Sequence, residues 1–102
     1  MNDTTFINII TDYLDQLLER IEASYWQWVD CEINAGVLNI HTAKNGIFII
    51  NRNVPRRELW LSSPFSGGAH FSYVTGVWLN TRTKEPFEPL LFKELDQLTY
   101  EL

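Results

Sequence analysis

The chain has 102 residues, of which 45% are hydrophobic and 21% are charged, a balance typical of one folded domain rather than of a disordered chain. It contains no apolar run near the roughly 18 residues of a membrane span and no pattern of a signal or transit peptide, so we expect a cytoplasmic protein with no membrane partner. The net charge of −5 argues against a nucleic-acid partner, and one cysteine excludes an internal disulfide and any multi-cysteine metal cage.

The acidic excess is confined to the first third of the chain. Residues 1–32 hold seven acids and one base, a balance of −6, whereas residues 33–102 hold six acids and seven bases, a balance of +1. A localised acidic surface is suited to binding cations or a basic protein.

The first predicted element is a helix over about residues 4–24. Hydrophobic residues recur at the helical period from Phe6 to Ile21, and Asp3 or Thr4 is predicted to cap its start. Opposite the apolar face, four carboxylates fall within an arc of about 80° when each residue turns about 100°: Asp12, Asp15, Glu19 and Glu22. This row is either an ordinary solvated helix face or a binding site, and the repulsion between its like charges favours the second interpretation somewhat.

The next element is a strand, because residues 29–33 alternate strictly between apolar and polar. Asp30 and Glu32 are predicted to face outward and to extend the acidic patch beyond the helix. Cys31 is predicted to face inward, as a buried structural thiol rather than a nucleophile.

The remaining pattern predicts short strands joined by hairpins and then a second helix. The strands are expected at residues 37–41, 47–51, 59–63, 69–73 and 77–80, and the helix from about residue 86. Short connections favour an antiparallel meander. We therefore predict an α+β fold in one domain, 1–102: a two-layer α/β sandwich with both helices on one face of a five- to seven-stranded, mainly antiparallel sheet.

The strand around Trp60 is a second candidate site. If Leu59 and Leu61 face the helices, Trp60 lies on the open face of the sheet, where an exposed tryptophan is a candidate protein contact. Its predicted neighbours in a partner-binding surface are listed here: Asn51, Ser62 and Ser63. The alternative is that Trp60 packs flat on its own sheet and contacts no partner.

No other motif predicts catalysis. Phosphate-binding loops are absent, and His41 and His70 are expected to be isolated sheet residues, while Glu88 is expected to play a structural part at the start of the second helix. Carboxylates without imidazoles or thiolates suit hard cations that prefer oxygen ligands, and a row along a solvated helix predicts weak, exchangeable binding. We expect no enzymatic activity.

The run Leu59-Trp60-Leu61-Ser62-Ser63-Pro64, followed by Ser66-Gly67-Gly68, resembles the frataxin family, most closely its bacterial branch, the CyaY proteins. The similarity extends over nearly the whole chain, including its first three residues and residues 30–34. The resemblance implies the frataxin fold and an iron-binding protein of iron–sulfur cluster assembly, acting as iron donor or as regulator of the cysteine desulfurase–scaffold complex.

The resemblance also implies a set of site residues. Iron, as Fe²⁺ or Fe³⁺, would bind weakly and exchangeably at Asp12, Asp15, Glu19, Glu22, Asp30 and Glu32, with Asp3 as an addition. The implied partners are a cysteine desulfurase and an iron–sulfur scaffold protein, with the protein a monomer or an iron-dependent oligomer. The family's other contact region is the sheet face that matches Asn51 and Trp60. A metal-independent adaptor that uses this face is the alternative function, and weak iron oxidation has no support in the sequence.

Two departures from the family pattern matter. Glu58 stands where the family usually has glutamine, and residues 23–29 contain no acid where bacterial relatives often carry a dense acidic stretch. We therefore expect a lower iron capacity than in the most acidic relatives.

Overall fold

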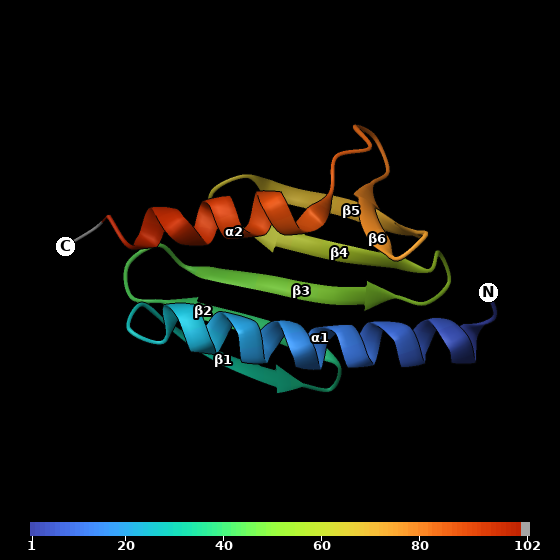
Figure 1. Cartoon of the computed structure of the whole chain (residues 1–102), viewed down its shortest axis with the longest axis horizontal. Coiled ribbons are helices and arrows are strands. Elements are labelled where there is room, and N and C mark those ends of the chain that lie inside the picture. The colour runs from blue at the N-terminus through green and yellow to red at the C-terminus, as the bar shows by residue number, and fades with distance from the viewer. Residues whose placement is uncertain (101–102) are drawn as a thin grey trace.

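A computed structural model describes residues 1–100, and residues 101 and 102 of the predicted domain lie outside this part. The elements follow one another as α1 (Asp3–Tyr25), β1 (Val29–Asn34), β2 (Val37–Thr42), β3 (Ile47–Asn53), β4 (Glu58–Ser63), β5 (Gly67–Val74), β6 (Val77–Asn80) and α2 (Phe87–Leu98) (Figure 1). The six strands form one antiparallel sheet in chain order, so that β1 and β6 are its edges.

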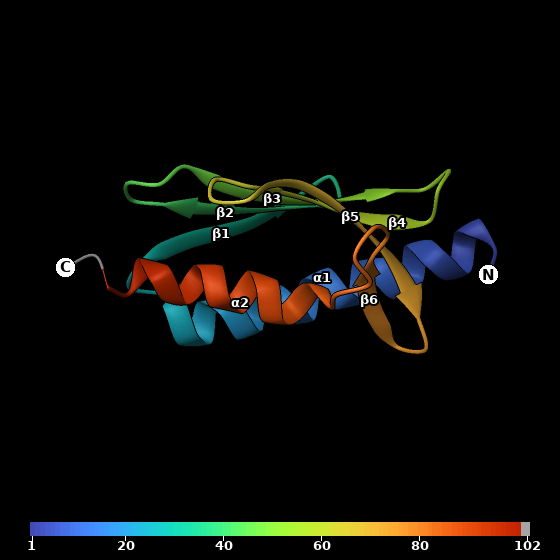
Figure 2. The ribbon, with the colours of Figure 1, turned by 90° about the horizontal axis from the view of Figure 1, so that it is seen from above.

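Both helices cover the same face of the sheet, and the other face is open (Figure 2). The core lies between these layers and is formed by alternate side chains of the central strands together with the apolar faces of α1 and α2: Phe6, Ile10, Leu17, Leu38, Ile40, Phe48, Ile50, Leu59, Leu61, Phe71, Trp78, Phe87, Leu91 and Leu95. The predicted two-layer sandwich of two helices on an antiparallel sheet is confirmed. No helix within residues 1–100 combines the length and the apolar character needed to cross a bilayer.

Helix α1 begins one residue earlier than predicted. Its cap is Asn2, whose side chain accepts a hydrogen bond of 2.8 Å from the backbone N–H of Thr5, so the predicted caps Asp3 and Thr4 are wrong. Asp3 is instead the first helical residue and forms an ion pair of 2.7 Å with Arg57, which joins the start of α1 to the turn between β3 and β4.

Five of the six strands are longer than the sequence pattern indicated, and β6 has the predicted bounds. Strand β5 begins at Gly67, in a segment predicted as a loop, because Gly67 pairs with Ser63 and Gly68 with Ser62 across the β4–β5 ladder. Glycine has low strand propensity, so pairing with the neighbouring strand and not local preference decides this boundary. The hairpin predicted between residues 69–73 and 77–80 is present, and its turn residues Thr75 and Gly76 have the positive φ angles, 44° and 87°, that such a tight turn requires.

Candidate functional site

The four predicted carboxylates of α1 lie on one exposed edge of the helix, opposite its buried face. We use the name acidic ridge for these side chains together with the two outward-facing acids of β1: Asp12, Asp15, Glu19, Glu22, Asp30 and Glu32. Within residues 1–100, Glu32 is the one member of the ridge that forms an ion pair.

The helix and strand portions of the ridge meet at Cys31. Burial, together with the nearby carboxylates of Glu22 and Asp30, raises the pKa of the Cys31 thiol to about 12. The thiol therefore stays protonated at neutral pH, and its half-buried side chain packs against the core as the predicted structural residue. Because Glu22 of α1 and Asp30 of β1 both act on this thiol, acids from the two elements lie near one point of the surface.

Asp3 does not belong to the ridge. It precedes Asp12 by nine residues, or about two and a half helical turns, which places it on the opposite side of α1. Its carboxylate is also held by Arg57 at 2.7 Å. The structure therefore does not bring Asp3 together with the other predicted metal-binding residues.

The far end of the ridge has a basic neighbour that the sequence did not reveal. His41 Nε2 lies 3.0 Å from the Glu32 carboxylate, although His41 was predicted to be isolated. The two residues lie on adjacent strands, and only the β1–β2 register, in which Asp30 faces His41, brings them within reach. When His41 is protonated, it partly neutralises this end of the ridge.

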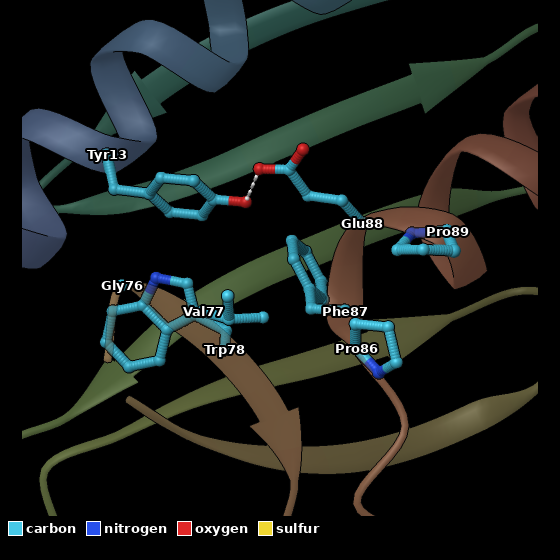
Figure 3. A pocket seen from close by; sticks show the side chains of 8 residues that line it. All are labelled: Tyr13, Gly76, Val77, Trp78, Pro86, Phe87, Glu88 and Pro89. Carbon is cyan, nitrogen blue, oxygen red and sulfur yellow. Dashed lines mark hydrogen bonds between the residues drawn. The ribbon is translucent and has the colours of Figure 1, made fainter. Parts of the chain in front are cut away.

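Arg20, the one basic residue of the first 32, points away from the ridge. Its guanidinium forms hydrogen bonds of 2.9 and 3.2 Å to Glu88 of α2. The Tyr13 hydroxyl donates to the same carboxylate (Figure 3). The bonds from Arg20 and then Tyr13 lower the pKa of Glu88, whereas burial and then Glu88 raise the pKa of Tyr13. Glu88 thus joins the two helices. This structural role is larger than the predicted one, which was confined to the start of the second helix.

This geometry determines what the ridge can bind. Within residues 1–100, no three His, Cys, Asp or Glu side chains converge on one point as a metal-binding group. An exposed row of carboxylates instead suits a hard cation that keeps much of its hydration shell and exchanges readily. The donor set fits iron as a transient cargo, and it equally fits the Lys and Arg side chains of a basic protein surface.

The second candidate site, on the open sheet face, is built around Trp60. The half-buried indole stacks on the His70 ring with 4.2 Å between ring centroids and 7° between planes. Its Nε1 donates a hydrogen bond of 2.9 Å to Glu58, a carboxylate only 8% exposed that also lies 3.5 Å from Arg56 Nε and 3.7 Å from His70 Nδ1. We call Glu58, Trp60 and His70 the Trp60 cluster.

The structure separates the predicted neighbours of Trp60. Asn51 is exposed and lies directly opposite Trp60 in the β3–β4 ladder, and Ser62 is exposed on the same face. Ser63 faces the helices and is 7% exposed, so its prediction as part of the open face is wrong. Its hydroxyl donates to the buried carboxylate of Glu94 on α2 and accepts backbone hydrogen bonds from the turn that follows β4.

His70 and Glu58 were not among the predicted site residues. Glu58 lies two positions before Trp60, so the alternation of a strand already places both on one face. His70 reaches Trp60 only through the β4–β5 register, which pairs these two residues directly. The sequence alone therefore indicates that Glu58 and Trp60 share a face, but it does not indicate the contact between His70 and Trp60.

Comparison with known proteins agrees with this architecture. The frataxin-like domain matches residues 1–101. The mitochondrial frataxin homolog of Saccharomyces cerevisiae is 31% identical over 90 residues, which are 84% of this chain and 52% of that protein. Mitochondrial frataxin of Dictyostelium discoideum is similar at 32%, and the chain again spans about half of its length.

A solved structure shares the fold over almost its whole length. The frataxin of Psychromonas ingrahamii, described as a member of the CyaY protein family, superposes with a TM-score of 0.84 at 29% identity, covering 99% of this chain and 94% of that one. From the domain match and the shared architecture, we conclude that the chain belongs to the frataxin family.

Proposed function

We propose that this protein binds iron weakly on the acidic ridge and uses the same ridge to dock on a basic surface of a cytoplasmic cysteine desulfurase–scaffold complex in iron–sulfur cluster assembly. The observation that carries the proposal is the ridge itself, where Asp12, Asp15, Glu19, Glu22 and Asp30 are exposed and form no ion pair within residues 1–100. A trimeric frataxin of S. cerevisiae, solved in complex with ferrous iron, superposes with a TM-score of 0.79 at 28% identity, over 90% of this chain and 86% of that one.

Physical chemistry favours one surface for both partners. Crowded like charges raise the energy of the free ridge, and either an iron ion or a set of Lys and Arg side chains relieves that repulsion. Since both partners need the same carboxylates, bound iron and the desulfurase compete unless the ion bridges them. We propose that the iron load thereby regulates docking, and that the protein acts as donor or regulator without enzymatic activity of its own.

An iron titration followed by NMR tests the metal-binding part. Added Fe²⁺ under anaerobic conditions is expected to broaden or shift backbone signals of residues 12–22 and 30–32 before any others. The double variant Glu19→Gln and Glu22→Gln should weaken the response, whereas Glu85→Gln, an exposed acid off the ridge, should leave it unchanged. A response confined to the open sheet face would refute the assignment, and oxygen uptake on Fe²⁺ addition above the buffer rate would refute the absence of catalysis.

The Trp60 cluster supports a second candidate function, a metal-independent adaptor. An indole fixed by a stacked ring and a buried hydrogen-bond acceptor loses little entropy on binding, which is typical of an interface anchor. Under this alternative, replacing Trp60 abolishes binding to the partner and iron has no effect on it.

A further inference from the structure

The hollow at the junction of α1 and β1 contains the most exposed tryptophan of the chain. Trp26 is 67% exposed and, with Trp28, Asp30 and His41, lines a surface hollow of about 280 Å³ at the end of the acidic ridge. A large apolar side chain left this open to water marks a contact site.

The electrostatics of the hollow favour a cation. The last turn of α1 has no basic residue, so the negative end of its helix dipole lies uncompensated beside Trp26, the C-cap. Asp30 is exposed and forms no ion pair within residues 1–100, and the ring of His41 is already held by Glu32. The two indole faces add the negative quadrupole that attracts cations.

These features distinguish between possible occupants. An anionic lipid surface would be repelled by Asp30 and by the adjoining ridge. An apolar segment would cover the indoles but would desolvate Asp30 without providing it a partner. A guanidinium suits both the indoles and Asp30, because its plane stacks on an aromatic ring while its N–H groups pair with a carboxylate.

We propose that the hollow receives an arginine side chain from the basic surface of the protein partner, stacked on the Trp26 indole and paired with Asp30. This inference rests on the proposed docking through the ridge and names the chemistry of one contact in it. Such a cation–π contact persists at salt concentrations that screen exposed ion pairs.

A titration with a blocked tri-arginine peptide tests the proposal, with tri-citrulline as the uncharged isostere. Indole N–H signals of Trp26 and Trp28 are expected to shift with tri-arginine and not with tri-citrulline. Trp26→Leu keeps the apolar bulk but removes the aromatic face, and it should weaken peptide binding by about two- to fivefold. The control Phe65→Leu removes an exposed aromatic ring outside the hollow, the ridge and the Trp60 cluster, and it should leave this affinity unchanged. Circular dichroism checks that both variants are folded.

Three results would overturn the proposal: an unchanged affinity in Trp26→Leu, equal shifts with both peptides, or wild-type binding to phosphatidylcholine vesicles that Trp26→Leu removes, which would assign the hollow to a membrane. The test also separates this inference from the proposed function. If iron leaves the ridge signals unmoved but Trp26→Leu still weakens peptide binding, the iron assignment fails and the arginine contact stands.

Discussion

The acidic ridge and the Trp60 cluster are both candidate binding surfaces, yet they are built on opposite principles. The ridge presents six acids, of which one has an ion-pair partner within residues 1–100, and α1 and β1 hold them in a row without restraining their ends. The Trp60 cluster surrounds one carboxylate, Glu58, with an indole, a guanidinium and an imidazole. The ridge therefore attracts partners by charge, and the cluster offers a fixed shape.

The difference predicts how each surface responds to its surroundings. Exposed charges act over about 10 Å at 0.1 M salt and adapt to ions or side chains of varied geometry, whereas a stacked, hydrogen-bonded indole is insensitive to salt and selective for shape. Two experiments separate the two surfaces, and a third tests the paired carboxylate of Glu88 as a contrast to the ridge.

The largest effect is expected from reversing charge on the ridge. The double variant Glu19→Lys and Glu22→Lys should weaken binding to a cysteine desulfurase about ten- to a hundredfold at low salt, because two attractive contacts become repulsive. Isothermal titration calorimetry at low and at 0.5 M salt should show this difference shrinking as salt rises. Trp60→Leu serves as the counterpart: if it abolishes binding while the charge reversal does not, the sheet-face adaptor is the correct function.

A smaller effect is expected on stability, with opposite signs at the two surfaces. Glu58→Ala removes the acceptor of the Trp60 indole and should lower the free energy of unfolding by about 1–2 kcal/mol. Glu19→Ala relieves repulsion on the ridge and should raise it by up to about 0.5 kcal/mol. Urea denaturation measures both, and equal losses in the two variants would show that the ridge is structural rather than a free surface.

The smallest effect is expected at Glu88. This acid lies outside the ridge and is hydrogen-bonded by Arg20 and Tyr13. Because Arg20 and Tyr13 lower the Glu88 pKa below its usual 4.5, its stabilising contribution is complete above that pH and is lost as the pH falls through the lowered value. Its side chain is 37% exposed, so the contribution is below about 1 kcal/mol. Glu88→Gln should be less stable than wild type at pH 7, and the difference should shrink as the pH falls below 4.5 and the Glu88 carboxylate becomes protonated. A pH-independent difference would contradict this origin.

Much of the fold could be predicted because it depends on periodicity. The helical repeat in residues 4–24 and the alternation in residues 29–33 each record which side chains are buried, so the sandwich and the α1 carboxylates followed directly. The start of β5 at Gly67 could not be predicted in this way, since the pairing of Gly67 with Ser63 of β4 determines it.

The differences between prediction and structure at the candidate sites have several physical causes. Ser62 and Ser63 are consecutive residues of β4, so their side chains point to opposite faces of the sheet. The Ser63 hydroxyl therefore meets Glu94 on the helix side. Asp3 was assigned to the ridge by family resemblance, although its helical phase and its pairing with Arg57 place it elsewhere. The partners of Trp60 and Glu32 come from neighbouring strands, and a single sequence does not specify such register.

The bond between Arg20 and Glu88 has a kinetic consequence. The bond turns the one basic side chain of residues 1–32 toward α2, so Arg20 does not offset the field of the ridge carboxylates that a basic partner would meet. Such a field accelerates diffusional encounter by orienting the partner before contact, and it affects the association rate more than the lifetime of the complex. If the ridge docks on a basic partner as proposed, the tie between the helices therefore also speeds that association.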